Sequence, residues 1–258
     1  MSGPLPRLSI VTVVRNDAAG LERTRRSLTE QTVAFEWIVV DGASTDGTRE
    51  RVLALFALEQ ARGVSEPDGG IYDAMNKGLR LARGDYVLFL NAGDHLAGPA
   101  ALAQASAAIA AAGSPDIVFF ASRMAFGRRT ILRPVKRPTY LRHGQPALHQ
   151  ATFVRRTRHL AHPFTPAYRI CGDYDALARM ASAGARMVSV PEVIGVNAFE
   201  PGAMSNNKLR LIREAAAIQR RVLALSWWTI GWSAARRALH SAVFKLLTAA
   251  APGKRTLR

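Results

Sequence analysis

The sequence predicts an α/β domain with a mostly parallel central sheet, helices on both faces of that sheet, and basic helices at the C-terminus. Three short apolar runs carry this prediction: residues 8–14 (LSIVTVV), 35–40 (FEWIVV) and 86–90 (YVLFL). Each run is almost continuously apolar, which is typical of a strand buried on both faces. Because helical patterns separate the runs, the chain has the spacing of βαβ units, which build parallel sheets with right-handed crossovers.

The remaining elements follow the same alternation as far as residue 121. Helices are expected over residues 17–30, 48–61, 71–82 and 99–112, and shorter strands over 63–65 and 116–121. Asp17 is placed to cap the first of these helices. Residues 122–148 lose the alternation, are strongly basic, and predict a hairpin and loops. Helical patterns return over 151–159 and 173–183, a last strand is expected over 186–190, and the chain becomes helical and basic from residue 206.

Length and composition limit the class of protein. A chain of 258 residues can bury one large core, and we expect a single domain over residues 1–205 followed by a helical tail over 206–258. One cysteine, Cys171, excludes an internal disulfide and fits a reducing cytoplasm; we interpret it as a small buried residue. The net charge of +16 indicates an anionic partner: a nucleic acid, a phosphorylated substrate or an acidic membrane face.

Two common phosphate-binding motifs are absent. A dinucleotide-binding domain carries G-x-G-x-x-G directly after its first strand, whereas residues 14–20 read VRNDAAG. The P-loop pattern is missing as well. The sequence therefore predicts that a ligand is held by side chains after successive strands and not by a glycine cradle.

Carboxylates follow three of the expected strands, at Asp41, Asp68 and Asp94. Because the carboxyl ends of parallel strands meet at one edge of a sheet, we expect these side chains to share a crevice. A carboxylate can accept the ring N–H of a nucleotide base, and an Asp on a glycine-bearing turn can bind a divalent metal through oxygen. The alternative for Asp94 is that it caps the helix that begins near Pro99. Lys77 could supply a cation to a diphosphate.

Several stretches together carry a family resemblance over roughly residues 7–200: SIVTVVRN, WIVVDGASTDGT, EPDGGIYDAMNKGLRLARGDYVLFLNAGD, HQATFVRR and GDYDALARM. This combination resembles the family 2 glycosyltransferases, which have the GT-A fold. The motifs GIYDAMNKG and FLNAGD are similar to motifs of bacterial enzymes that build exopolysaccharide or other surface glycans. The resemblance implies an inverting enzyme that moves a sugar from a nucleoside-diphosphate sugar to an acceptor hydroxyl.

The resemblance also implies roles for individual residues. Asp41 matches the carboxylate that contacts the base of the donor, and Val14 and Asn16 line its pocket. Asp68 and Lys77 match positions near the sugar and the diphosphate. Asp94 matches the metal ligand, which implies Mn²⁺ or Mg²⁺ as a cofactor.

On the acceptor side, Asp173 matches the catalytic base, preceded in the chain by His149 and Gln150. Asp173 and Asp175 would diverge by about 200° on a helix, so only one can face the site. We assign Asp173 as the base and Asp175 as an acid of the first helical turn. Asp46 is interpreted as a turn or cap residue.

Two departures from the family pattern leave a second function open. Asn91 and Gly93 stand where many members carry Asp, so Asp94 is the one carboxylate left in the metal motif. Gly172 replaces the Glu that many members carry before the catalytic Asp. A nucleotide-sugar-binding protein without catalysis would fit these departures.

The C-terminal tail combines tryptophans with flanking arginines. Residues 222–235 are uncharged and include Trp227, Trp228 and Trp232. This stretch is too short to span a bilayer, but Trp flanked by Arg is typical of an interfacial helix. The sequence predicts peripheral binding to the anionic inner face of the cell membrane and a glycan or lipid-linked acceptor. The alternative is a helix packed on the domain or on another copy. No nucleic-acid partner is expected, because no helix-turn-helix or RNA-recognition signature is present.

Overall fold

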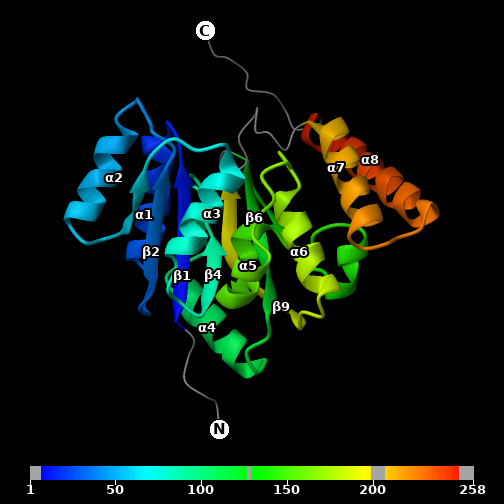
Figure 1. Ribbon diagram of the computed structural model, residues 1–258, viewed down its shortest axis with the longest axis horizontal. Helices are drawn as coiled ribbons and strands as arrows, with labels where there is room; N and C mark the ends of the chain where they lie inside the picture. Colours follow the sequence, from blue (N-terminus) through cyan, green and yellow to red (C-terminus); the bar gives the residue numbers. More distant parts are fainter. Residues whose placement is uncertain (1–6, 127–128, 199–206, 250–258) are drawn as a thin grey trace.

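The computed structural model describes residues 7–126, 129–198 and 207–249, and these residues surround one twisted central sheet (Figure 1). In the described residues the sheet has nine strands in the order β3-β2-β1-β4-β8-β6-β9-β5, with β7 paired to β6. The strands are β1 Leu8–Val14, β2 Glu36–Asp41, β3 Arg62–Ser65, β4 Tyr86–Phe89, β5 His95–Leu96, β6 Ile117–Phe126, β7 Arg129–Arg133, β8 Thr152–Arg155 and β9 Met187–Ala198.

The sheet is mostly parallel, as the sequence predicts. β1 pairs in parallel with β2 and β4, β2 with β3, and β6 with β9. Three strands run the other way: β8 is antiparallel to β4 and β6, β5 to β9, and β7 to β6. The three apolar runs of the sequence therefore lie in one sheet as β1, β2 and β4.

Helices cover both faces of the sheet (Figure 1). They are α1 Ala18–Thr29, α2 Thr48–Ala57, α3 Ile71–Leu81, α4 Ala101–Ala111, α5 Arg156–Ala161, α6 Gly172–Ser182, α7 Lys208–Arg221 and α8 Trp227–Ala249, with the short 3₁₀ helices η1 Pro138–Arg142 and η2 His149–Ala151. Side chains of α1, α2 and α4 form one core cluster, and those of α3, α6 and α7 form the other.

β1 shows why the central strands are continuously apolar. Val11 and Val13 pack into the cluster of α3 and α6, whereas Ile10 and Val14 pack into the cluster of α1 and α2. All seven residues of β1 are buried, because successive side chains point to opposite faces and both faces are covered. The expected cap of the first helix is confirmed, since the Gly20 N–H donates to Asp17 Oδ1 at 2.7 Å.

Four sequence-based expectations are corrected. The helix expected over 151–159 is strand β8 followed by a helix that begins only at Arg156, because residues 152–154 are buried between β4 and β6. The helix expected to reach residue 61 ends at Ala57, and Glu59 has φ +53° in the turn that follows. The strand expected over 186–190 continues to Ala198 as β9. Asp94 does not cap α4, whose N-cap is Ala100.

The helices α7 and α8 lie at the end of the molecule opposite α2, beside α6 (Figure 1). α7 contributes Ala215 and Ile218 to the core cluster that also contains α6. The predicted boundary between residues 205 and 206 lies outside the described residues, so the division into domain and tail stays a prediction. None of the described helices is both long and apolar enough to span a bilayer.

The packing of α7 predicts a difference between two of its apolar residues. Ile218 is 0% exposed and Leu209 is 59% exposed. We expect Ile218→Ala to lower the free energy of unfolding by about 2–5 kcal/mol, because it leaves a cavity in the core. Leu209→Ala on the same helix should change the free energy by less than about 0.5 kcal/mol. Urea denaturation of both variants measures this, and equal small effects would show that α7 does not contribute to the core.

Candidate active site

The strand ends carry two clusters of polar side chains, and Asp41 is the buried residue at the centre of the first. It ends β2 directly beside Val14 at the end of β1, and the Gly42 N–H donates to the Val14 carbonyl at 2.9 Å. The carboxylate of Asp41 is fully buried. It accepts hydrogen bonds from the Ser44 N–H, the Ser44 hydroxyl and, at 2.6 Å, the Ser65 hydroxyl. These donors hold the carboxylate in one orientation at the strand edge.

Asn16 connects the turns after β1 and β2. Its N–H donates to Ser44 Oγ at 2.8 Å, and its side-chain Oδ1 accepts the Thr45 N–H at 2.8 Å. Asn16 has φ +51°, a conformation that Asn tolerates better than most residues. The structure therefore brings Val14, Asn16 and Asp41 together. The sequence interpretation missed Ser44, although this residue lies in the stretch WIVVDGASTDGT, and it missed Ser65 at the end of β3.

Asp68 lies beside the turn that follows Asp41, whereas the ammonium group of Lys77 is already paired within its own segment. A Cβ atom at Gly42 would lie 2.4 Å from Asp68 Oδ2, so glycine at that position permits the close approach. The Gly70 N–H donates to Asp68 Oδ1 at 2.8 Å. Lys77 Nζ lies 2.8 Å from a carboxylate oxygen of Glu66 and 2.6 Å from the Pro67 carbonyl oxygen. Its charge is thus partly neutralised within the segment after β3.

Asp94 is the buried residue at the centre of the second cluster of polar side chains. Its carboxylate accepts hydrogen bonds from Gln150 Nε2 at 2.7 Å, Asn197 Nδ2 at 2.9 Å and the Ala198 N–H at 3.2 Å. Burial raises the pKa of Asp94 above its ordinary value, against the lowering effect of His149 and of these donors. The turn before it needs Gly93 at φ +92°. Asn197 was missed from the sequence because it lies far along the chain on β9.

The residues around Asp94 fit a divalent cation in part. In the ranges that the structure describes, no three His, Cys, Asp or Glu side chains gather as a metal site. Two amide oxygens there, Asn91 Oδ1 and Gln150 Oε1, are buried without a hydrogen-bond partner among the described residues. Such oxygens and a carboxylate are the ligands that hard cations prefer. Asp94, Asn91 and Gln150 thus offer oxygen atoms that a divalent cation can use as ligands.

His149 connects this corner to Asp173. Asn91 Nδ2 lies 3.2 Å from His149 Nε2, and His149 Nδ1 lies 3.5 Å from Asp173 Oδ2. If Asn91 donates to Nε2, the proton of a neutral imidazole is on Nδ1 and faces the carboxylate. Burial acts to raise the pKa of Asp173, but hydrogen bonds from His149, Gln145 and the Tyr174 N–H hold that pKa below its ordinary value. Asp173 is therefore ionised at neutral pH.

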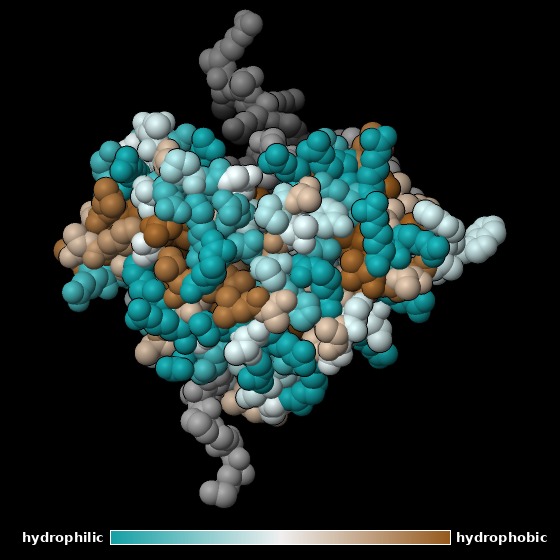
Figure 2. All heavy atoms as spheres, viewed as in Figure 1, coloured by the Kyte–Doolittle hydropathy of each residue, from teal (hydrophilic) through white to brown (hydrophobic). Residues whose placement is uncertain are grey.

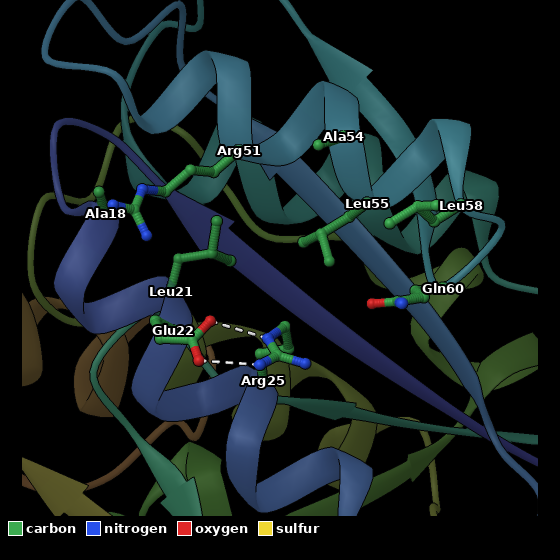
Figure 3. Close-up of a pocket in the computed structure, with 9 residues that line it drawn as sticks. All are labelled: Ala18, Leu21, Glu22, Arg25, Arg51, Ala54, Leu55, Leu58 and Gln60. Atoms are coloured by element: carbon green, nitrogen blue, oxygen red, sulfur yellow. Dashed lines mark hydrogen bonds and ion pairs between the residues drawn. The ribbon is translucent and has the colours of Figure 1, made fainter.

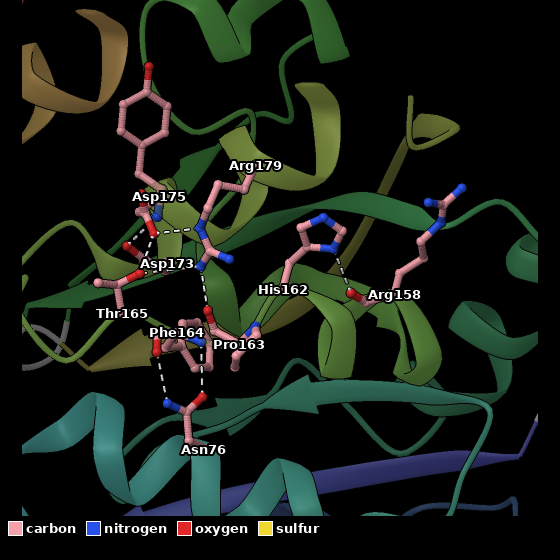
Figure 4. Close-up of polar contacts among 10 residues, drawn as sticks. Asn76, Arg158, His162, Pro163, Phe164, Thr165, Asp173, Asp175 and Arg179 are labelled. Atoms are coloured by element: carbon pink, nitrogen blue, oxygen red, sulfur yellow. Dashed lines mark hydrogen bonds and ion pairs between the residues drawn. The ribbon is translucent and has the colours of Figure 1, made fainter. Parts of the chain in front are cut away.

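The carboxylate of Asp175 points away from the contacts that connect Asn91, His149 and Asp173. Its buried carboxylate accepts the Thr165 hydroxyl at 2.7 Å and pairs with Arg179 Nε at 2.8 Å (Figure 4). Asn76 holds the adjoining loop through both backbone groups of Phe164, at 2.8 and 2.9 Å. Asp175 is thus fixed between α6 and the loop before it, in agreement with the expected divergence of the two acids.

Comparison with known proteins identifies the family. The profile described as Glycosyl transferase family 2 matches residues 9–170. The chain belongs to this family. A PGL/p-HBAD biosynthesis glycosyltransferase of Mycobacterium bovis is 33% identical over 211 residues, which cover 78% of this chain and 80% of that protein. An uncharacterized glycosyltransferase of Mycobacterium tuberculosis is 42% identical over 112 residues. That match covers 42% of either chain, so it spans less than half the length of this relative.

Solved structures show that the fold is GT-A. S. aureus TarS in complex with UDP-GlcNAc superposes with a TM-score of 0.67 at 17% identity, over 89% of this chain and 71% of that one. A mannosyltransferase from Pyrobaculum calidifontis in complex with GDP-Man and Mn²⁺ superposes with a TM-score of 0.65 at 20% identity, over 97% and 81% of the two chains.

The position of Tyr72 explains one departure of this sequence from the pattern of family 2 glycosyltransferases. A Cβ atom at Gly172 would lie 2.7 Å from the ring of Tyr72. The Glu that many members carry before the catalytic Asp therefore does not fit here while Tyr72 occupies that space. The Tyr72 hydroxyl itself lies 3.5 Å from Asp173 Oδ1, a contact that the sequence did not indicate.

Two residues have structural contacts, as expected. Cys171 is buried and free, and burial raises the pKa of its thiol to about 12. A thiol with that pKa is protonated at neutral pH and is not a nucleophile. Asp46 accepts the N–H and the hydroxyl of Thr48 at 3.0 and 2.6 Å, so it binds the first residue of α2.

A groove of about 320 Å³ lies elsewhere, between α1 and α2 (Figure 3). Its lining includes Leu21, Leu55 and Leu58, together with the ion pair of Glu22 and Arg25. The hydrogen bond from Arg25 lowers the pKa of Glu22 to about 2. None of the predicted site residues lines this groove, so it is separate from the strand-end site.

Proposed function

We propose that this protein is an inverting glycosyltransferase that moves a hexose from a nucleoside-diphosphate sugar to an acceptor hydroxyl in bacterial surface-glycan assembly. The observation that carries the proposal is the continuous contact from Asn91 through His149 to Asp173. It connects the corner of Asp94, where a diphosphate would bind, to an ionised carboxylate that can accept a proton. The named glycosyltransferase activity of the M. bovis relative supports the reaction class.

The donor would lie along the ends of β1, β2 and β4. Asp41, with Val14 and Asn16 beside it, is the proposed site for the base, and Asp68 and Lys77 lie toward the sugar and diphosphate. TarS and the Pyrobaculum enzyme are described with UDP-GlcNAc and GDP-Man, which supports a nucleotide-sugar donor.

Asp94, with Asn91 Oδ1 and Gln150 Oε1, would hold a Mn²⁺ or Mg²⁺ ion. A bound divalent cation would stabilise the negative charge that develops on the leaving diphosphate. The Mn²⁺ in the Pyrobaculum complex supports this cofactor.

Asp173 would act as the general base. As the acceptor oxygen attacks the anomeric carbon, its proton moves to the Asp173 carboxylate and the bond from that carbon to the diphosphate breaks. A single displacement of this kind inverts the anomeric configuration. His149 would orient Asp173 through its Nδ1–H and would contact the acceptor side together with Gln150.

The second candidate function is binding of a nucleotide sugar without transfer. The single carboxylate of the metal corner, Asp94, and the absence of the Glu before Asp173 favour it. The two functions differ in turnover and not in affinity, so release of nucleotide from a bound nucleotide sugar by the parental protein separates them.

The exposed tryptophans of α8 favour a membrane partner. Trp227, Trp228 and Trp232 are 67%, 91% and 66% exposed, and Arg220 lies over the Trp227 ring at 5.4 Å. Aromatic rings of this kind lie at the headgroup level while cations contact anionic lipids. We therefore propose a peripheral position on the inner face of the cell membrane and a glycan or lipid-linked acceptor.

Substitutions at Asp41 and at Asp94 should change nucleotide binding in different ways when Mn²⁺ is added. Asp41→Asn should weaken binding of UDP or GDP with and without Mn²⁺, because it alters the base site. Asp94→Asn should remove only the additional stabilisation that Mn²⁺ gives to the nucleotide complex. Thermal shifts with each nucleotide, with and without Mn²⁺, measure both effects, since a ligand of the native state raises stability. A parental Mn²⁺ response in Asp94→Asn contradicts the metal assignment.

The base assignment predicts a large loss of rate. Asp173→Asn keeps the size of the side chain but accepts no proton, so turnover should fall by about 10² to 10⁴. Nucleotide affinity should hardly change, because the lost interaction belongs to the transition state. Asp175→Asn is the matched control and should retain the rate at a cost in stability. The measurement is nucleotide release from the nucleotide sugar that binds. A parental rate in Asp173→Asn would make His149 the next candidate.

The membrane proposal predicts a dependence on α8. Trp228→Ala combined with Trp232→Ala should reduce cosedimentation with phosphatidylglycerol vesicles, and added salt should reduce it further. Leu53→Ala on α2 combined with Leu58→Ala at its C-cap is the control, since these side chains are 47% and 66% exposed at the other end of the molecule, where apolar residues gather on the surface (Figure 2). If both double variants cosediment with the vesicles to the same extent, the membrane contact lies elsewhere on the protein.

A further inference from the structure

Glu214 of α7 binds the segment that leads into the helix of Asp173. Its carboxylate accepts the N–H groups of Arg169, Ile170 and Cys171 at 3.1, 2.9 and 2.9 Å. These residues immediately precede α6, and Asp173 is the second residue of that helix. The segment is thus held by the carboxylate of a residue that lies 43 to 45 positions later in the chain.

The N-cap position of α6 does not hold the start of the helix by a side-chain hydrogen bond. Its N-cap residue, Cys171, makes no side-chain cap hydrogen bond. The first N–H groups of a helix have no partner within the helix, and a carboxylate near them is favoured by the helix dipole. Glu214 satisfies the N–H of the N-cap residue, Cys171, and the two N–H groups before it, so it anchors the backbone at the start of α6.

The same segment is held from its other side by α3. The Tyr72 hydroxyl donates to the Ile170 carbonyl at 2.6 Å, and its ring packs against Gly172. Glu214 therefore binds the N–H groups of this short loop, and Tyr72 binds one of its carbonyl groups. The backbone of Asp173 follows directly from this clamp, so its position depends on both partners.

We propose that Glu214 is a positioning residue for Asp173 and that α7 is in this sense part of the active site. The inference rests on the proposed role of Asp173 as the base. Glu214 acts through the backbone and touches neither donor nor acceptor. Because displacement of a reacting group by about 1 Å can cost on the order of 10²-fold in rate, loss of this clamp should reduce turnover without weakening nucleotide binding.

Gln219 is a matched control on the same helix. It is buried, and its Nε2 donates to the Arg142 carbonyl at 2.7 Å. Gln219→Ala therefore removes a contact between α7 and the rest of the domain but leaves residues 169–171 bound. A general loosening of α7 would appear in both variants, whereas loss of the clamp would appear only in Glu214→Ala.

The first test needs no substrate. Amide hydrogen exchange of the full chain should show faster exchange at residues 169–171 in Glu214→Ala, because three N–H groups lose their acceptor, and parental exchange there in Gln219→Ala. Glu214→Gln should fall between the two, since one amide oxygen remains as an acceptor. Parental exchange at 169–171 in Glu214→Ala would overturn the inference.

The second test is a double-mutant cycle with Asp173→Asn, read as nucleotide release in the presence of Mn²⁺ from UDP-GlcNAc or GDP-Man, whichever gives the larger thermal shift. Glu214→Ala should lower kcat by about 10- to 100-fold with KM for the donor unchanged. In the Asp173→Asn background the same change should alter kcat by less than about twofold, because no base remains to be positioned. Equal losses in both backgrounds would overturn the inference.

The cycle also separates this inference from the proposed function. A slow Asp173→Asn variant with a parental Glu214→Ala variant overturns the positioning role alone. A parental Asp173→Asn variant overturns the base assignment, and the positioning role with it.

Discussion

The buried carboxylate of Asp94 is the interaction on which the arrangement of the site depends. An ionised carboxylate is costly to bury unless hydrogen bonds compensate for the lost water. Here the compensating groups come from two distant parts of the chain, Gln150 of η2 and Asn197 with Ala198 on β9. The backbone oxygen of Asp94 in turn accepts the Thr24 hydroxyl of α1 at 2.7 Å. One residue therefore joins α1, the end of β4, η2 and β9.

The direction of β8 explains how residues so far apart in sequence meet. β8 is antiparallel to β4, with Val87 opposite Val154. The start of β8 therefore lies at the carboxyl end of β4, next to the turn that carries Asn91 and Asp94. η2, which holds His149 and Gln150, immediately precedes β8. A parallel strand in this place would have put the same two residues at the opposite edge of the sheet.

Patterns that repeat along the chain were readable from the sequence, and single polar contacts were not. β1, β2 and β4 were predicted to within one residue at either end, because burial on both faces requires an unbroken apolar run. The divergence of Asp173 and Asp175 followed from helix geometry alone. β8 was mistaken for helix because its four residues are too few to show a period. Ser65, Asn197 and Glu214 gave no signal, since each acts by one or a few hydrogen bonds to a partner that only the topology brings near. Asp94 and His149 were identified through the family resemblance, and their contact through Asn91 was visible only in the structure.

The C-terminal helices are compatible with both interpretations that the sequence left as alternatives. Ile218 and Ser233 are buried against the domain, whereas Trp228 on the same pair of helices is 91% exposed. A helix packed on the domain and a helix that presents tryptophan to a surface are therefore compatible. α7 contacts the loop before Asp173 through Glu214, and α8 packs on α7 with its tryptophans outward. On the proposed function, the acceptor side and the membrane-binding side are separated by only two helices. A lipid-linked acceptor could then reach Asp173 from the bilayer surface without any part of α7 or α8 crossing the membrane.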